Sequence, residues 1–423
     1  MKANRFLSLI LVFLFTLPFV VAVSAQDSTE EPMMMAHCEG EPLTDSSPVI
    51  KIGSAVSDTG KYAREGGDTR RGYNLWLDWV MNEYGGIDVN GVCYGVDLIM
   101  YDDEGDSDTV SVLTEKLIID DGVNFILGPY SSGLTSVASV ITERENIIMV
   151  EGNGSSETLF ERGFQNLFAV LTPASFYAKG GVELAYDQGA RTGAIAYVDE
   201  AFSTSVAQGA KDKMEELGMD VLAFESYPSD ATDLSALVTN FRELNPDIVV
   251  AAGHDNDATL FVNSAKDLDF NPQAMLMTVG PSTPAWVDGM GADANYLLGA
   301  SQWQSTLGYS DPWFGSASDY EQRYVAAYDM EPSYQSAEST ATALVLQLAI
   351  EAAGSLDTDA VRTALHDMDV TTFYGPIKFD DTGKNAGKPM VTVQIQDGSI
   401  LIVAPTSAAE ADVIYPAPAW ADR

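Results

Sequence analysis

Positive charge is scarce in this chain of 423 residues, which has 22 lysines and arginines against 62 aspartates and glutamates and a formal net charge of −40. Nucleic-acid binding needs clustered lysine and arginine, so this balance argues against a nucleic-acid partner. It also disfavours docking to an anionic lipid surface. The charge favours a soluble protein whose copies repel one another, and we therefore expect a monomer.

Cysteine and histidine are also rare, with two and three residues respectively. These residues supply most ligands of zinc and haem sites, so we expect neither a metal site nor a cofactor. The sequence contains no Gly-x-Ser-x-Gly, no His-Glu-x-x-His, no Walker loop and no complete dinucleotide fingerprint. The acidic run at 102–106 does not match a calcium loop, and we interpret it as a solvated loop at a strand end. We expect no catalytic residues and no enzymatic activity.

The amino terminus has the pattern of an export signal. Two basic residues precede an apolar run over 6–23, and small residues follow up to Ala25. This pattern predicts a signal peptide over 1–25 and a mature protein that is periplasmic or extracellular, with no part inserted in the membrane. An uncleaved anchor is the alternative, because the run is nearly long enough to cross a bilayer. Residues 26–48 follow as an acidic leader.

The two cysteines are Cys38 in this leader and Cys93 in the body of the chain. They form an even pair in a compartment that permits disulfides, so we expect a bond between them. Closing that loop is worth about 4 kcal/mol in the chain-entropy model. Two separate thiols are the alternative.

Strand and helix patterns alternate along the rest of the chain. The first series has apolar strands over 49–55, 96–100, 125–127 and 147–150, with helices over 69–84, near 110–117 and over 133–144. The second has strands over 193–198, 219–224, 247–252 and 274–278, with helices near 175–188, 204–217, 232–244 and 256–268. Repeated strand–helix–strand units require parallel sheets with helices on both faces, so two series predict two doubly wound α/β lobes. A helical stretch over 316–367, a hairpin over 391–403 and a loose tail over 405–423 complete the prediction.

Ligands of doubly wound sheets bind beyond the carboxyl ends of the strands, where helix amino ends present free N–H groups. Two turns rich in small residues follow neighbouring strands of the first series. Ser131 and Ser132 in the first turn are explained equally well as helix caps or as ligands of a small anion, above all a carboxylate. Asn153 and Ser155 in the second turn would lie on the opposite side of the same pocket.

Three aromatic side chains follow strands of the second series and are candidates for the facing wall. Phe202 either covers the ligand or packs against its own helix. His254 is a weaker candidate, because a lone histidine at a strand end says little about contact. Trp303 lines the pocket or packs at a hinge.

The order of these motifs resembles the extracytoplasmic substrate-binding proteins of branched-chain amino acid and amide ABC transporters. The resemblance covers about residues 49–403. The matching motifs are Ser57-x-Thr59-Gly60, Asn82-x-x-Gly85-Gly86-Ile87, Asp102-Asp103, Gly128-Pro129-Tyr130-Ser131-Ser132, Asn153-Gly154-Ser155, Tyr334-Gln335-Ser336-Ala337 and Tyr374-Gly375-Pro376. Each motif is short, and it is their order and spacing that make the resemblance specific.

The resemblance implies the type I periplasmic binding protein fold, in which two lobes joined by three crossovers close around a ligand by a hinge. Residues 49–172 with 304–378 would form lobe 1, and 173–303 with 379–404 would form lobe 2. The implied function is to bind a small amino acid, amide or carboxylate and deliver it to an ABC permease and its ATPase subunits. A ligand-sensing module of the same fold and a secreted hydrolase are the alternatives.

The resemblance also implies roles within the site. The carboxylate site of the family corresponds to Ser132 and Ser155, with the side-chain carbonyl of Asn153 available to an ammonium group. The aromatic residue that covers the ligand corresponds to Phe202.

One segment departs from the family pattern. Amino acid binders usually place an acidic residue after the strand at 274–278, where this chain has Val279-Gly280-Pro281-Ser282. An amide, a urea-like compound or an aromatic carboxylate then fits as well as an amino acid, unless Asp255 or Asp199 supplies the missing charge.

Overall fold

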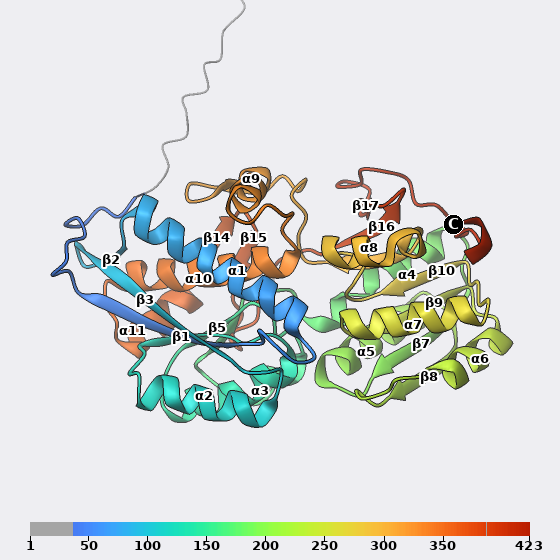
Figure 1. Ribbon diagram of the computed structural model, residues 1–423, viewed down its shortest axis with the longest axis horizontal. Helices are drawn as coiled ribbons and strands as arrows, with labels where there is room; N and C mark the ends of the chain where they lie inside the picture. Colours follow the sequence, from blue (N-terminus) through green and yellow to red (C-terminus); the bar gives the residue numbers. More distant parts are fainter. Residues whose placement is uncertain (1–36, 386) are drawn as a thin grey trace, which may run out of the picture. The chain divides into compact units, whose positions relative to one another are not determined.

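The computed structural model describes residues 37–385 and 387–423 (Figure 1). The predicted signal peptide and the first part of the predicted leader lie outside these ranges. Two large sheets run through the described chain, one in the order β2-β3-β1-β4-β5-β6 and one in the order β17-β16-β11-β10-β9-β7-β8. The prediction of two doubly wound α/β lobes is confirmed.

The first lobe is built on the smaller of these sheets. Its strands are β1 (Val49–Val56), β2 (Ile87–Val89), β3 (Val92–Asp102), β4 (Phe125–Leu127), β5 (Met149–Glu151) and β6 (Leu167–Ala169). Helices α1 (Ala63–Trp79) and α10 (Tyr334–Ala353) cover one face, and α2 (Ser107–Ile119) and α3 (Ser132–Arg144) cover the other (Figure 1). The central strands are short apolar runs because helices bury both of their faces. All but β2 pair in parallel, so their carboxyl ends meet at one edge.

The second lobe is built on the larger sheet. Its strands are β7 (Thr192–Val198), β8 (Asp220–Tyr227), β9 (Ile248–Ala252), β10 (Ala274–Met277), β11 (Leu298–Ser301), β16 (Val391–Gln396) and β17 (Ser399–Ala404). Helices α4 (Lys179–Asp187) and α5 (Ala201–Glu216) cover one face, and α6 (Ser235–Leu244), α7 (Asp255–Asp267) and α8 (Pro284–Met290) cover the other. The predicted hairpin is β16–β17, which adds an antiparallel edge.

A third group of elements belongs to the first lobe. It consists of β12 (Ser310–Asp311), β13 (Gly315–Ser316), α9 (Ala317–Tyr328), α11 (Thr358–His366), β14 (Asp369–Thr372) and β15 (Gly375–Lys378). Aromatic residues of α9 and of the β14–β15 turn join the core that lies under α1 and α10. Among the described residues no single helix is both long enough and apolar enough to cross a membrane, although α10 and α11, bent by 111°, meet those criteria as a pair.

The core of the first lobe depends on close contact between α1 and α10. A Cβ atom placed on Gly72 of α1 would lie 2.3 Å from the Ser336 backbone oxygen of α10. The Thr340 hydroxyl donates to the Gly72 carbonyl at 2.7 Å, and the Trp76 indole N–H donates to Gln347 at 3.0 Å. Glycine at residue 72 therefore sets the distance between the two helices.

Helix α1 begins at Ala63, six residues before the predicted start at 69. The adjacent Gly66 and Gly67 make a helix look unlikely in the sequence. The structure explains Gly66, because a Cβ atom there would lie 1.9 Å from the Ser57 backbone oxygen. The first turn of α1 is thus pressed against the end of β1.

The prediction of a loose tail over 405–423 is wrong. The Trp420 side chain packs into the core of the second lobe, and its indole N–H donates to the Phe270 carbonyl at 2.8 Å. The Ala417 N–H donates to the Gln273 carbonyl, also at 2.8 Å. One buried indole and a few backbone hydrogen bonds hold a segment whose proline-rich composition suggested no fixed structure.

The predicted disulfide between Cys38 and Cys93 is confirmed, with a Cα–Cα distance of 6.2 Å. Cys93 lies on β3, while Cys38 precedes β1 by eleven residues. The Cys38 N–H also donates to the Tyr84 carbonyl at 2.7 Å. The disulfide therefore fastens the described end of the leader to the first lobe.

The chain crosses between the lobes after β6, after β11 and after β15, and side chains tie these three segments together. Thr172 and the Gln302 amide exchange two hydrogen bonds, at 3.1 and 3.0 Å. The Thr172 hydroxyl donates to the Lys388 carbonyl at 2.8 Å, and the Lys388 ammonium donates to the Gln302 carbonyl. Burial lowers the pKa of Lys388 to about 7. The exact lobe boundaries stay predictions.

Candidate functional site

Two serine-rich turns lie side by side at the carboxyl ends of β4 and β5. The Ser132 hydroxyl oxygen accepts from the N–H groups of Ser155 and Ser156 at 3.1 and 3.0 Å, which joins the turns. Ser131 caps α3, because its hydroxyl oxygen accepts from the Leu134 N–H at 3.3 Å. The structure thus shows capping by Ser131, whereas the Ser132 hydroxyl oxygen accepts from the neighbouring turn.

A fully buried carboxyl supports both turns from below. Glu151, the last residue of β5, accepts from the Thr135 hydroxyl at 2.9 Å and from the Asn153 N–H. A Cβ atom on Gly128 would lie 1.7 Å from a Glu151 carboxyl oxygen, so the neighbouring turn must have glycine there. Burial raises the pKa of Glu151 to about 8. The folded protein therefore holds a proton on this residue at neutral pH.

This carboxyl predicts a pH dependence of stability. The pKa of Glu151 is higher in the folded chain than the ordinary value of 4.5, so its contribution to stability falls as pH rises from 4.5 to about 8. The size is about 1 kcal/mol per pH unit in that window. Glu151→Gln, which mimics the protonated carboxyl, should match the wild type at pH 5 and exceed it at pH 8 in urea unfolding.

Glu161→Gln, at an exposed acid of the same lobe, is the control and should leave the pH profile unchanged. Equal profiles for Glu151→Gln and the wild type would contradict the assignment.

Aromatic side chains from both lobes meet above the turns. Tyr62 and Tyr130 come from the first lobe, and Tyr177, Phe202 and His254 come from the second. The His254 ring centroid lies 5.0 Å from Tyr62, 5.5 Å from Tyr130 and 5.2 Å from Phe202. Tyr177 lies 5.1 Å from Phe202. Phe202 therefore contacts rings beyond its own helix, at the lobe interface.

Polar contacts also join the lobes at this level. The Tyr130 hydroxyl lies 3.0 Å from His254 Nδ1, and the Tyr62 hydroxyl donates to Glu200 at 3.1 Å. Lys61 forms an ion pair with Glu200 at 2.8 Å. Beside these residues lies a cavity of about 280 Å³, which Ser131 and Tyr62 help to line. The lobes are in contact around the serine turns.

The site holds two carboxyls that are removed from water. Burial, and then the charge of Asp255, raises the pKa of Glu65. Burial also raises the pKa of Asp255, against the lowering effect of Arg64 at 3.2 Å. Burial lowers the pKa of His254 to about 4, so this ring is neutral at pH 7.

Several polar atoms of this region are buried and have no hydrogen-bond partner among the described residues. They are Asn153 Oδ1, Ser203 Oγ, His254 Nε2, Asp255 Oδ1, Ser282 Oγ, Thr283 Oγ1 and both amide atoms of Gln335. Buried polar atoms in native proteins nearly always have a partner, and each exception needs an explanation. A ligand bound between the lobes would supply the missing partners.

The structure brings together six of the seven residues predicted from the sequence. Ser131, Ser132, Asn153 and Ser155 form the turns, and Phe202 and His254 face them from the other lobe. Of the two acids considered as substitutes for the missing charge, Asp255 is buried at the lobe interface, whereas Asp199 is exposed.

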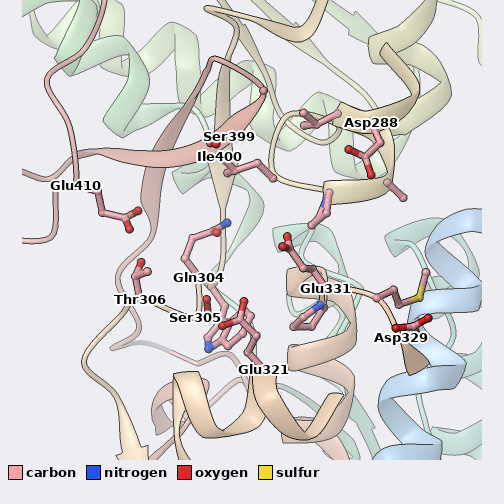
Figure 2. Close-up of a pocket in the computed structure, with 17 residues that line it drawn as sticks. Asp288, Gln304, Ser305, Thr306, Glu321, Asp329, Glu331, Ser399, Ile400 and Glu410 are labelled. Carbon is pink, nitrogen blue, oxygen red and sulfur yellow. The ribbon is translucent and has the colours of Figure 1, made fainter. Parts of the chain in front are cut away.

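Trp303 lies apart from the other six. Its indole N–H donates to the Phe373 carbonyl at 3.0 Å, and its ring contacts Tyr320 at 5.6 Å, both in the first lobe. This placement agrees with packing next to a crossover. Trp303 also lines a separate cavity of about 570 Å³ (Figure 2).

Carboxylates dominate that second cavity. Figure 2 shows Glu321 beside Ser305 and Glu331 on the side toward Asp329, with Glu410 and Asp288 on opposite sides of the cavity. Within the described parts of the chain, no three histidine, cysteine, aspartate or glutamate side chains are grouped so that they could hold a metal ion. The buried rings of the serine site do not line this cavity.

Sequence reasoning missed Tyr62, Glu65, Tyr177 and Tyr334. Glu65 lies in the first turn of α1, which was not predicted because Gly66 and Gly67 follow it. Tyr177 lies inside the segment near 175–188 that was predicted as one helix. Burial raises the pKa of Tyr177. Ser155 and Tyr334 both lie beside the Tyr177 hydroxyl, and their hydrogen bonds to it act in the opposite direction. Tyr334 belongs to the motif Tyr334-Gln335-Ser336-Ala337, which supports the family resemblance but was not assigned to the site.

Comparison with known proteins agrees with this architecture. A family model described as periplasmic binding protein matches residues 49–399. Leu/Ile/Val-binding protein homolog 8 of Brucella abortus is 28% identical over 391 residues, which cover 86% of this chain and 93% of that protein.

Two solved structures show the same fold. One is the branched-chain amino acid transporter substrate binding protein LivJ from Streptococcus pneumoniae in complex with isoleucine, with a TM-score of 0.74, 20% identity and coverage of 87% of this chain and 100% of that one. The other is a solute binding protein of an ABC transporter from Rhodopseudomonas palustris in complex with 3,4-dihydroxy benzoic acid, with a TM-score of 0.73, 16% identity and coverage of 89% and 99%. The predicted type I fold is confirmed.

Proposed function

The chain belongs to the periplasmic binding protein family, and on this premise we propose that it binds a small carboxylate-bearing solute between its lobes and delivers it to an ABC permease. The observation that carries the proposal is the set of buried, unpartnered polar atoms at strand-end turns and first helical turns of both lobes. Permease recognition would follow the contact between the lobes, because closure around a ligand shifts an open–closed equilibrium.

We propose Ser132 and Ser155 as the carboxylate site. Both side chains are buried, and the turns that hold them are fixed by the bonds from the Ser155 and Ser156 N–H groups to Ser132. Hydroxyl donors in a site with little water form strong hydrogen bonds to a carboxylate. Phe202 and His254 would cover the ligand from the second lobe.

The chemical class of the ligand has two candidates, because the related structures contain different compounds. LivJ holds isoleucine, and the Rhodopseudomonas protein holds 3,4-dihydroxy benzoic acid. Both compounds carry a carboxylate, and only isoleucine carries an ammonium group. The proposed carboxylate site accepts either one.

Changing both serines tests the site. Ser132→Ala combined with Ser155→Ala should weaken binding of a carboxylate ligand about tenfold or more, because two buried hydrogen bonds to a charged group are lost. Isothermal titration with a ligand found by a thermal-shift screen of amino acids, amides, ureas and aromatic acids measures the change.

Ser407→Ala, at an exposed serine, is the matched control and should bind like the wild type. An unchanged affinity in the double variant would show that these turns do not bind the ligand. Chromatography of the ligand after prolonged incubation separates binding from hydrolysis, since a receptor returns the ligand unaltered.

We also propose that the protein works outside the cytoplasm as a monomer and that its permease acts with ATPase subunits. The family supports the compartment, and the strong negative charge supports the monomeric state. Analytical ultracentrifugation with and without ligand tests the oligomeric state, and a stable dimer would contradict it.

A further inference from the structure

Two cationic side chains of the first lobe reach acids of the second lobe beside the serine site. The Lys61 ammonium lies 2.8 Å from a Glu200 carboxylate oxygen, and the Arg64 guanidinium lies 3.2 Å from an Asp255 carboxylate oxygen. The chain has only 22 lysines and arginines among its 423 residues. Two of them lie within four residues and pair with acids across the lobe interface, so this segment forms a charged contact between the lobes.

Two further hydrogen bonds reinforce the same contact. The Asn256 side-chain amide donates to the Lys61 carbonyl at 2.9 Å, and the Tyr62 hydroxyl donates to the Glu200 carboxylate at 3.1 Å. The Lys61 and Glu200 side chains are 45% and 22% exposed, so water and salt screen their attraction only in part. Residues 61–64 are called the latch segment below, because four contacts from this segment cross to the second lobe.

The acidic run that the sequence predicted as a solvated loop holds the chain just before the latch segment. Asp102 accepts from the N–H groups of Asp58 and Thr59 at 3.0 and 3.2 Å, and from the Thr59 hydroxyl at 2.8 Å. Asp103 is fully buried and accepts from the Ser57 hydroxyl. The acidic run is therefore solvated only in part, and it fixes the loop from which the latch segment starts.

Charge in the rest of the molecule opposes contact between the lobes. The formal net charge is −40, and charges of one sign repel one another. We propose that the latch segment is an electrostatic latch that attracts the second lobe and sets how often the lobes touch before a ligand binds. Asp102 and Asp103 act as positioning residues, because their hydrogen bonds hold the loop in place. This property goes beyond the receptor function and does not depend on the identity of the ligand.

Exchanging the two charges of the Lys61–Glu200 pair tests the latch. Lys61→Glu and Glu200→Lys each place like charges opposite one another, and each should shift the equilibrium toward separated lobes by at least about tenfold. The double variant restores a pair of opposite charges and should return the lobes toward the wild-type arrangement. Small-angle X-ray scattering of the protein without ligand at low ionic strength measures the radius of gyration, which rises when the lobes separate.

An ion pair inside one lobe is the matched control. Lys266 and Asp293 lie 2.6 Å apart in the second lobe, and their side chains are 45% and 28% exposed. Lys266→Glu should therefore leave the radius of gyration unchanged. Thermal unfolding shows whether each variant is folded.

Salt provides a second test that needs no charge reversal. Raising the ionic strength from about 0.01 M to about 1 M shortens the screening length from about 30 Å to about 3 Å. In the wild type this weakens the latch, whereas in Lys61→Met combined with Glu200→Gln it screens mainly the general repulsion. The radius of gyration of the wild type should therefore rise with salt relative to that of the uncharged variant.

Asp102→Ala tests the positioning role. It frees the loop before the latch segment and changes none of the charges in the latch segment, so the radius of gyration at low ionic strength should rise. Glu104→Gln, at an exposed acid of the same run, removes one negative charge as well and should have no such effect. An unchanged radius in Asp102→Ala would overturn the positioning role.

The latch itself would be overturned by two results. One is a radius of gyration in the folded Lys61→Glu and Glu200→Lys proteins equal to that of the wild type, or a double variant no more compact than the single ones. The other is an equal response to salt in the wild type and the uncharged variant. These measurements contain no ligand, so they leave the receptor function to the serine variants.

Discussion

Gly72→Val should destabilise the protein by at least about 4 kcal/mol, measured by urea unfolding. The new Cβ atom would lie 2.3 Å from the Ser336 backbone oxygen and 2.7 Å from the Ser339 Cβ atom. Both are parts of α10 that cannot rotate away, so α1 and α10 must separate. The separation also strains the hydrogen bond from Thr340 to the Gly72 carbonyl.

A second glycine on the same helix provides the control. A Cβ atom on Gly67 would meet only the Arg71 side chain, at 3.5 Å or more. Gly67→Ala should therefore be neutral or stabilise the protein by up to about 1 kcal/mol, since alanine favours the helix. A loss below about 1 kcal/mol for Gly72→Val would show that the two helices adjust and do not depend on this contact.

Replacing Cys38 and Cys93 by serine together should lower the free energy of unfolding by about 4 kcal/mol. The disulfide closes a loop with a sequence separation of 55, and its removal gives the unfolded chain more freedom. The end of the leader also loses its covalent attachment to β3. Urea unfolding of the wild type and the double variant, each with and without a reducing agent, measures the difference.

The reducing agent should destabilise the wild type and leave the double variant unchanged. Mass spectrometry of the unfolded, unreduced wild type after thiol alkylation should find no modified cysteine. A double variant within about 1 kcal/mol of the wild type would show that the leader contributes little to the folded state.

The sequence predicted the lobes well because parallel strands buried on both faces are apolar runs with little ambiguity. It predicted β1 almost to the residue and also found the three-residue β4, but it missed β2 and β6, which are equally short. Strands so short carry almost no periodicity. The tail with Trp420 was also missed. One side chain holds this tail in place, and the pocket that receives it exists only in the folded chain.

The candidate site was predicted where it follows a rule about strand ends. The turns with Ser132 and Ser155 come directly after β4 and β5, and parallel strands place such turns together. Glu65 and Asp255 obey no such rule, because they are far apart in the sequence and meet only when the lobes touch. Their burial, and with it their raised pKa values, depends on that meeting.

The long separation between α1 and α10 has a consequence for how the chain is made. Helix α1 must wait for α10, which ends at Ala353, before the core of the first lobe can close. Strands β7 to β11 of the second lobe lie between these two helices in the sequence, and their sheet is completed only by β16 and β17, at Val391–Gln396 and Ser399–Ala404. Neither lobe can finish folding while the ribosome is still making the first 353 residues. Such a nascent chain cannot reach its folded state through most of its synthesis, and an unfolded polypeptide is the form that a narrow translocation channel can pass.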